Sequence, residues 1–406
     1  MRRKNKNSRA SIRIAHLIEA LGSGGAERLL YTNLKHLDRS RFESEVITVF
    51  SGAAHWKEPI RELGVEVTSL DCRSLRDLPK GVRRLRRLLH NGRPDLIHTH
   101  LWAANVIGRV AGWLGGIPVI GSIHNPDHEP DAWDDGAEVS LLKRWLAWSM
   151  DRWTARFGCE RLVAVSEYVR HSAHERLGFP LERIDLLYNP IDIDQFQSGA
   201  PRGRRRLIEE LSLPEGSFIL LNVARVSPQK GLLYAIRALP AVREKYPETY
   251  LVSVGDTDDH RWLSRLEAEA DSLGVARYMR FLGVRRDIPD LLRCCDLFVF
   301  PSLYEGLGIS LIEAMASGCA CVASRAGPIT EVIRQGVDGW LVPPADVQTL
   351  ADAVCLLLND EGRRKRLGEA AAKSVRAQFH PETAARKLED VYEAVLRSAR
   401  SGACQV

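Results

Sequence analysis

Short apolar runs alternate with amphipathic helical patterns along most of the chain. In the first half, apolar runs rich in β-branched residues predict strands at 12–18, 44–50, 65–70, 95–99, 117–123 and 161–165. Segments with a helical period separate them, at about 26–37, 75–90, 103–114, 138–157 and 167–177. Because nearly continuous apolar strands alternate with helices, we expect a parallel sheet that helices cover on both faces.

The alternation stops over residues 189–206 and then begins again. This segment, NPIDIDQFQSGAPRGRRR, is rich in proline, glycine and arginine without periodicity, as is typical of an interdomain connection. After it, the pattern predicts strands at 218–224, 249–254, 278–282, 296–300, 319–323 and 338–342. The helices expected there lie near 230–244, 261–273, 287–293, 310–317, 328–334 and 346–358, followed by 361–378 and 381–398.

These patterns predict an α/β protein with two doubly wound domains of comparable size. We expect a first domain at 1–190, a linker at 191–206, a second domain at 207–378, and a last helix within 379–406 that crosses back onto the first domain. Two domains fit the 406 residues, since one domain typically has roughly 100–200 residues. Open α/β sheets bind ligands beyond the carboxyl ends of their strands, so we expect the site in a cleft between the domains.

Composition narrows the class of protein. Hydrophobic residues make up 45% and charged residues 27% of the chain, as in ordinary soluble domains. A net charge of +5 is too mild for a dedicated nucleic-acid binder, so we expect no nucleic-acid partner. The eight cysteines form no C-x-x-C pair, which favours a reducing, cytoplasmic location.

Signals for secretion, membrane spanning and metal binding are weak. The basic start, MRRKNKNSRA, has no apolar segment behind it and is not a secretory signal. Residues 101–123 are apolar, but Arg109 and the glycines and proline at 115–118 interrupt them, so we expect no transmembrane segment. His98 and His100 share one strand face without a nearby carboxylate or cysteine, so we expect no metal site.

Glycines follow the first predicted strand, in the sequence Gly22-Ser-Gly24-Gly25-Ala-Glu27. They allow backbone N–H groups to close on an anion at the start of the next helix, as in a phosphate site. A dinucleotide fingerprint would require glycine where Glu27 stands, which argues against a dehydrogenase. A tight turn without a ligand is the alternative.

Cations and carboxylates mark the second domain. Arg225 and Lys230 follow its first strand and precede a helix, where two cations can clamp a diphosphate. Neither has an acidic neighbour in this segment, which favours an external anion over simple solvation.

Glu305 lies on a glycine-bearing loop after the strand DLFVF, and Glu313 lies in the first turn of the next helix. Ser310-x-x-Glu313 also matches a capping box, which would make Glu313 purely structural.

The joint order of these motifs resembles the family-four retaining glycosyltransferases of the GT-B fold. The resemblance rests on YEGLGISLIEAMASG with its two glutamates, on Arg225-x4-Lys230, and on GGAE after the first strand. The segments IHTH, SIHN, AVSEYV and NPID also fall where that family has comparable segments, so the resemblance covers nearly the whole chain. It implies two Rossmann-like domains facing each other across a cleft, and transfer of a sugar from a nucleotide-diphosphate sugar to a hydroxyl group.

The resemblance also implies residue roles. Arg225 and Lys230 would grip the donor diphosphate, Glu313 the ribose hydroxyls, and Gly24 and Gly25 the phosphate from the other domain. The transferred sugar would contact Glu305 and the backbone amides of Gly306, Leu307, Gly308 and Ile309, while the base would lie near Leu282–Val284, with Val284 as a contact. His100 and His124 correspond to positions near the donor sugar or the acceptor, and His98 is interpreted as structural.

The mechanism of the family that the chain resembles implies that the sugar is transferred on one of its faces through an oxocarbenium-like state. The leaving diphosphate would help to deprotonate the acceptor. Arg225 and Lys230 would then replace a metal ion, and neither a metal nor another cofactor is expected. We expect a UDP-sugar donor and a lipid-linked or envelope polysaccharide acceptor, by analogy with the family. Two alternatives are a sugar-nucleotide epimerase of the same fold and an inactive membrane-surface scaffold. Asp256-Thr-Asp258 is interpreted as a loop and helix cap.

Residues 73–93 combine an apolar stripe with a basic surface. The stripe consists of Leu75, Leu78, Val82, Leu85 and Leu89, and only Asp77 opposes the cations Arg73, Arg76, Lys80, Arg83, Arg84, Arg86, Arg87 and Arg93. We expect the stripe to pack on the first sheet. Together with Arg2, Arg3, Lys4, Lys6, Arg9 and Arg13, the cations would hold the first domain against anionic lipid. The expected location is therefore the cytoplasm, with peripheral association at the inner face of the membrane.

Overall fold

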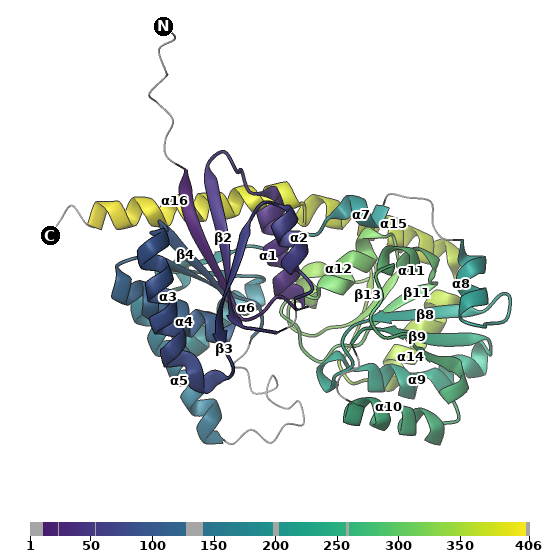
Figure 1. The fold of residues 1–406 in the computed structure, drawn as a ribbon. Helices are drawn as coiled ribbons and strands as arrows, with labels where there is room; N and C mark the ends of the chain where they lie inside the picture. Colours follow the sequence, from purple (N-terminus) through teal and green to yellow (C-terminus); the bar gives the residue numbers. More distant parts are fainter. Residues whose placement is uncertain are drawn as a thin grey trace, which may run out of the picture. The chain divides into compact units, whose positions relative to one another are not determined.

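The computed structural model describes residues 11–22, 24–52, 54–126, 141–197, 203–256 and 260–402. Five of the N-terminal cations and Thr257-Asp258 of the predicted loop lie outside these residues. The described residues form two compact units (Figure 1). The first holds the described residues up to Pro126, those from Leu141 to Pro190, and those from Pro381 onward, whereas the second holds those from Ile191 to His380.

The first unit is built on a parallel sheet. Within the described residues its strands are β1 (Ile12–Ile18), β2 (Phe42–Phe50), β3 (Glu66–Cys72), β4 (Leu96–His100), β5 (Val119–Ile123), β6 (Arg161–Ala164) and β7 (Ile184–Leu186). They lie in the order β3-β2-β1-β4-β5-β6-β7, and each neighbouring pair is parallel. The predicted sheet is therefore confirmed, and the strand that sequence analysis missed is β7, which has only three residues.

Helices cover both faces of this sheet. They are α1 (Gly25–His36), α2 (Lys57–Glu62), α3 (Leu78–Gly92), α4 (Trp102–Gly115), α5 (Leu141–Gly158), α6 (Glu167–Leu177) and α16 (Pro381–Gly402). Leu85 of α3 and Ile107 of α4 pack in one apolar cluster with Leu17 of β1. On the other face, Tyr392 of α16 packs in a cluster with Ile14 of β1. The last helix of the chain thus completes the core of the first unit.

The second unit repeats the same architecture with a parallel sheet in the order β10-β9-β8-β11-β12-β13. The strands are β8 (Phe218–Val223), β9 (Thr249–Val254), β10 (Met279–Phe281), β11 (Leu297–Phe300), β12 (Cys321–Ser324) and β13 (Trp340–Val342). The helices are α7 (Ile193–Gln197), α8 (Arg204–Glu210), α9 (Leu232–Lys245), α10 (His260–Ser272), α11 (Ile288–Cys294), α12 (Ile309–Ala316), α13 (Ile329–Val332), α14 (Val347–Leu358) and α15 (Glu361–Gln378).

The expectation of an aperiodic linker at 189–206 is wrong in its local structure. Helix α7 lies inside this segment and α8 begins within it. Ile193 and Phe196 of α7 are buried, so this part of the segment packs. A helix of five residues is shorter than the window in which a helical period can be recognised, which explains why the pattern failed to predict it.

Strand order fixes where a ligand can bind in each unit. In both sheets the strand order, not the strand direction, reverses between the strands that come first and fourth in the chain, that is, between β1 and β4 and between β8 and β11. The loops that leave these two strands go to opposite faces of the sheet, and a crevice opens at their carboxyl ends. Each unit therefore offers one such switch point.

None of the helices that the structure describes is both long enough and apolar enough to span a bilayer.

Candidate active site

The loops that leave β8 and β11 are tied to each other at the switch point of the second unit. The N–H of Leu303 donates to the carbonyl of Gln229 at 2.8 Å, and Nε2 of Gln229 donates to the carbonyl of Tyr304 at 3.0 Å. At Gly231, which has φ +63°, a Cβ atom would lie 1.9 Å from the carbonyl oxygen of Pro301. Only glycine permits this approach, and the two loops are consequently held in fixed positions.

Lys230 and Glu305 form an ion pair between these loops. Nζ of Lys230 lies 2.7 Å from Oε1 of Glu305, and Oγ of Ser302 donates to the same oxygen at 2.8 Å. The carboxylate is buried, with Glu305 only 5% exposed. Lys230 has no acidic neighbour in its own segment, but it gains an acidic partner from the loop after the neighbouring strand β11. The inference that Lys230 is left for an external anion alone is therefore wrong.

Arg225 lies on the loop after β8, before Lys230, and its side chain is exposed. Among the described residues, the structure records no hydrogen bond or ion pair for its guanidinium group. Backbone hydrogen bonds connect this loop to the loops after β9 and β10. The N–H of Val226 donates to the carbonyl of Asp256 at 2.8 Å, and that of Gly255 to the carbonyl of Gly283 at 2.9 Å. The loops after β8, β9 and β10 are thus connected, and Val284, which is 61% exposed, lies on the last of them.

Helix α12 follows the Glu305 loop and carries Glu313. Its N-cap is Gly308, with φ +88°, and the helix begins at Ile309. Ser310 is therefore inside the helix, so the capping-box interpretation of Ser310 and Glu313 is wrong. Glu313 lies in the second turn rather than the first, and it is only 3% exposed. A buried carboxylate needs polar contacts. We therefore expect Glu313, on the helix that leaves the switch point, to have a role beyond helix capping.

The glycine-bearing segment between Glu305 and α12 is buried along its length. Gly306, Leu307 and Gly308 are buried, and Ile309 is half-buried. The first backbone N–H groups of α12 lack partners within the helix, as at every helix start, and the helix dipole adds partial positive charge there. The N–H groups at the start of α12 can therefore donate hydrogen bonds to the oxygens of a ligand.

In the first unit, Gly24 and Gly25 lie at the start of α1, directly after the β1 end of the switch point. Gly24 is the N-cap, and the helix begins at Gly25. A Cβ atom on Gly24 would lie 2.5 Å from Oε2 of Glu27, so the missing side chain leaves room for this carboxylate. The N-terminal N–H groups and the dipole of α1 make this an anion site in geometry.

His100 and His124 end neighbouring strands of the first unit and contact each other. Nδ1 of His100 lies 3.3 Å from Nε2 of His124. Burial lowers the pKa of His124 to about 4 and holds the pKa of His100 well below its usual value. Both rings are consequently uncharged near neutral pH, and they can exchange hydrogen bonds but supply no positive charge there.

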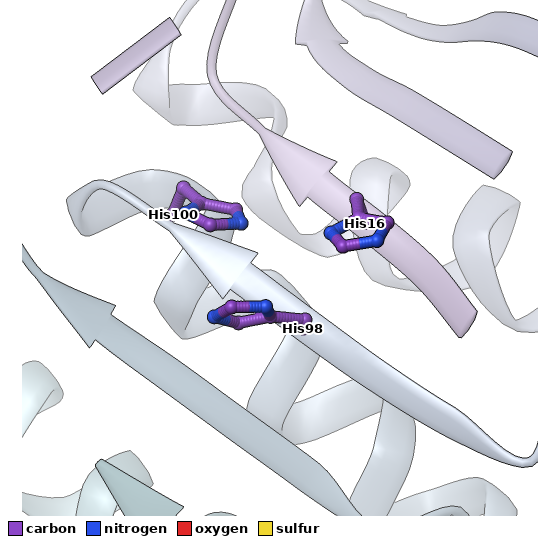
Figure 2. A group of neighbouring side chains, drawn as sticks. All are labelled: His16, His98 and His100. Carbon is purple, nitrogen blue, oxygen red and sulfur yellow. The ribbon is translucent and has the colours of Figure 1, made fainter. Parts of the chain in front are cut away.

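His98 joins this group from the same strand, and His16 joins it from β1. Figure 2 shows His16, His98 and His100 gathered on adjacent strands, with ring centroids 4.2 Å apart for His98 and His100 and 5.5 Å apart for His16 and His98. One ring nitrogen from each of the three residues lies within 4.8 Å of the others. Sequence analysis missed His16, although a histidine inside the apolar strand IRIAHLI was a signal.

His98 has a structural place in this cluster. Its Nδ1 lies 2.7 Å from the hydroxyl of Tyr392, and its Nε2 lies 2.8 Å from the hydroxyl of Ser122. Both ring nitrogens are therefore used, and a metal ion could take His98 as a ligand only by breaking one of these bonds. We assign no metal to the three histidines on this ground.

Glu19 and Leu101 are two further residues of the first switch point that sequence analysis missed. Oε1 of Glu19 accepts the N–H of Ala103 at 2.7 Å, in the first turn of α4, and burial raises the pKa of the Glu19 carboxyl. Leu101, between His100 and α4, has φ +73°, a conformation that costs a non-glycine residue free energy. The available signal was the position of Glu19 directly after a predicted strand.

Two family models match separate halves of the chain. Residues 23–195 match Glycosyltransferase Family 4, and residues 203–374 match Glycosyl transferases group 1. The chain belongs to this glycosyltransferase family. The matched ranges contain every residue to which the resemblance gave a role, from Gly24 to Glu313.

Named relatives of this glycosyltransferase include enzymes of different specificity. It is 25% identical over 361 residues to the UDP-Gal:alpha-D-GlcNAc-diphosphoundecaprenol alpha-1,3-galactosyltransferase of Escherichia coli, covering 88% of this chain and 90% of that one. It is 29% identical over 402 residues to a D-inositol 3-phosphate glycosyltransferase of Xylanimonas cellulosilytica, covering 94% and 90%. These relatives share the reaction class and differ in their named substrates.

Solved structures share its fold. The structure of Anabaena Alr3699/HepE in complex with UDP-glucose superposes with a TM-score of 0.82 at 23% identity, covering 94% of this chain and all of that one. The lipopolysaccharide glycosyltransferase WaaG gives a TM-score of 0.70 at 19% identity, covering 92% and 98%. The two Rossmann-like units of this glycosyltransferase therefore have the GT-B fold.

Proposed function

We propose that this glycosyltransferase is a retaining enzyme that uses a UDP-sugar donor, needs no metal ion, and glycosylates a hydroxyl of a lipid-linked or envelope polysaccharide intermediate. The observation that carries the proposal is the set of charged residues at the switch point of the second unit. Arg225 and Lys230 follow β8, Glu305 follows β11, and buried Glu313 lies on the next helix.

The charges at this switch point suit a nucleoside diphosphate. An arginine with no recorded partner in the described chain can offer its guanidinium fork to phosphate oxygens. Lys230 adds a second positive charge, positioned by its contact with Glu305. Glu313 would accept hydrogen bonds from ribose hydroxyls, and Val284, on the loop after β10, would contact the base.

Transfer then depends on positioning and electrostatics. The N–H groups from Gly306 to Ile309, with Glu305, would orient the sugar, and the two cations would stabilise negative charge on the leaving diphosphate. That diphosphate would help to remove the proton of the acceptor hydroxyl on the same face of the sugar. Cations in these places supply the charge that a divalent ion supplies in other transferases, which supports a metal-free reaction.

For the first unit we propose an acceptor-side role. Gly24 and Gly25 would offer N–H groups to phosphate, and His100 and His124 would position hydroxyl groups. Because both histidines are uncharged near neutral pH, they would act as hydrogen-bonding groups rather than as cations. The relative from Escherichia coli, whose name includes a UDP-Gal donor and a diphosphoundecaprenol acceptor, supports the proposed substrate classes.

Incubation of the purified enzyme with a panel of nucleotide sugars and a lipid extract tests the proposal. Mass spectrometry should show a glycosylated lipid from a UDP-sugar, NMR should show that the anomeric configuration of the donor is retained, and EDTA should leave the rate unchanged. An epimerised nucleotide sugar formed without acceptor would instead indicate the epimerase, and no product with any donor would indicate the inactive scaffold. An inverted product or complete loss of activity in EDTA would contradict the mechanism.

Glu313→Gln should weaken UDP binding by roughly 10- to 100-fold, because a hydrogen bond to a charged group contributes about 1.5–3 kcal/mol. Isothermal titration calorimetry with UDP measures the change. The matched control is Glu369→Gln, an exposed glutamate on α15 of the same unit, which should bind UDP normally. Unchanged affinity in Glu313→Gln would remove this residue from the donor site.

Helix α3 supports peripheral membrane association. Leu85 and Leu89 are buried as predicted, whereas Leu75 is 55% exposed and lies in a 3₁₀ turn before the helix, so its place in the stripe was wrong. Arg84 donates to the carbonyl of Asp71 at 3.2 Å. Arg83, Arg86 and Arg87 are exposed, and within the described residues the structure records no partner for them.

Reversing these three charges, Arg83→Glu, Arg86→Glu and Arg87→Glu, should remove the salt-sensitive part of the binding to vesicles of phosphatidylcholine and phosphatidylglycerol. Each arginine near an anionic surface contributes up to about 1 kcal/mol. Co-sedimentation measures the bound fraction, and the exposed arginines Arg205 and Arg277 of the second unit, changed in the same way, are the control. Equal binding by the wild type to neutral and anionic vesicles would argue against an electrostatic contact.

A further inference from the structure

Helix α5 exposes an apolar surface that the first unit does not use. Of its 18 residues, only Asp151 and Ala155 are buried. Sixteen large apolar side chains are exposed in the described part of the chain, and seven of them lie on this helix: Leu141, Leu142, Trp145, Leu146, Met150, Trp153 and Phe157. A surface of this kind on a soluble protein marks an interaction site.

Polar contacts explain why the apolar side chains of α5 point outward. On its inner side, Nη1 of Arg109 in α4 pairs with Oδ1 of Asp151 at 2.5 Å. Nε1 of Trp102 donates to the carbonyl of Ala147 at 3.3 Å, and Nε1 of Trp148 to the carbonyl of Arg176 at 2.9 Å. Helix α5 is thus fixed by hydrogen bonds and an ion pair, and its apolar side chains remain in contact with solvent.

Three of the seven exposed apolar side chains of α5 are aromatic. Trp145 is 57% exposed and Trp153 is 64% exposed, and the ring of Trp153 stacks on that of Phe157 with centroids 5.0 Å apart. Trp113, near the end of α4, is 66% exposed. Tryptophan is the residue that accumulates at the boundary between lipid headgroups and acyl chains, where its ring is partly apolar and its N–H remains hydrated.

Basic residues lie on α5 and on the nearby helix α3. Helices α3, α4 and α5 pack side by side (Figure 1), so the arginines of α3 and the tryptophans of α5 are carried by one layer of helices. On α5 itself, Lys143 and Arg156 are exposed between the apolar residues. An apolar helix surface flanked by cations is typical of proteins that bind anionic membranes in the plane of the interface.

We propose that the exposed face of α5, defined by Leu142, Trp145, Leu146, Trp153 and Phe157, inserts into the interfacial region of a bilayer that contains anionic lipid. Charge selects this occupant over a second copy of the chain, because a two-fold contact would bring the basic residues of both copies together. The helix would lie in the plane of the interface, and the arginines of α3 would contact headgroups.

This inference extends the membrane association proposed above and does not require the transfer chemistry. The two contributions differ in their response to salt. Contacts between arginine and headgroups weaken as the Debye length falls to about 3 Å at 1 M salt, whereas burial of tryptophan does not. A bound fraction that survives high salt therefore reports on α5, and the fraction lost reports on α3.

The test uses the full chain and vesicles of phosphatidylcholine mixed with phosphatidylglycerol, with co-sedimentation at low and high salt. The variant is Trp145→Ser with Trp153→Ser, which changes only exposed side chains. The wild type should keep part of its binding at 1 M salt, and its tryptophan fluorescence should shift to the blue and be quenched by brominated lipid. The variant should lose at least about tenfold in partition coefficient, equivalent to about 1.4 kcal/mol.

The matched control is Leu273→Ser with Val337→Ser, which removes exposed apolar side chains from the second unit and should leave binding unchanged. Equal partition by the wild type and the α5 variant would overturn the proposal. So would sedimentation of the wild type as a dimer that the same variant dissociates without vesicles, since α5 would then bind a second copy. UDP titration of each variant separates the outcomes, because failure of the donor proposal leaves vesicle binding intact.

Discussion

Arg225→Ala and Lys230→Ala are each expected to lower the rate of sugar transfer by roughly 30- to 1,000-fold, or about 2–4 kcal/mol. In the proposed mechanism, both cations face negative charge that develops on the leaving diphosphate, so their effect is larger in the transition state than in the bound donor. Steady-state kinetics with a UDP-sugar and the lipid acceptor would measure kcat and kcat/KM. The matched control is Lys245→Ala, an exposed lysine at the end of α9, which should retain normal turnover.

The two variants are expected to differ in stability. Arg225 is exposed and has no recorded partner in the described chain, so its removal should leave the free energy of unfolding nearly unchanged. Removal of Lys230 leaves the Glu305 carboxylate buried, with Ser302 as the one side-chain partner that the described residues still give it, and breaking such a pair costs about 3–5 kcal/mol. The double variant Lys230→Ala with Glu305→Ala should therefore recover stability but not transfer. Near-normal turnover in both single variants would contradict the donor clamp.

The fold class was predictable because it depends on period and order. Buried parallel strands are apolar on both faces, so β8 and β11 are visible in the sequence before any contact is known. The missed elements β7, α2 and α7 have three to six residues and carry no readable period, whereas the equally short β10 and β13 were predicted. They form because neighbouring elements bury one or two of their side chains.

The candidate site was predictable in its members and not in its contacts. Glycine and charged residues after strands identify the loops, which is how Arg225 and Glu305 were found. The ion pair of Lys230 with Glu305 joins residues 75 positions apart, and it follows only from the adjacency of β8 and β11. His16 was missed for the same reason, since only the pairing of β1 with β4 brings it beside His98.

Loss of the Asp151 carboxylate is expected to destabilise the first unit by about 3–5 kcal/mol. Arg109 is fully buried, and Asp151 is the one ion-pair partner that the described residues give it. The Nε and Nη2 atoms of Arg109 have no hydrogen-bond partner in the described chain. Asp151→Ala would thus leave an uncompensated charge in the core.

Urea unfolding followed by tryptophan fluorescence measures this effect, because six of the nine tryptophans are described in the first unit. The matched control is Glu209→Ala, which breaks the exposed pair with Arg205 and should cost less than about 1 kcal/mol. The double variant Arg109→Leu with Asp151→Leu should recover much of the loss, since apolar residues carry no desolvation cost. Equal, small effects of Asp151→Ala and Glu209→Ala would show that the buried pair is solvated. A large effect confined to Asp151→Ala would identify this pair as the contact that fixes α5, with its apolar surface outward, on α4.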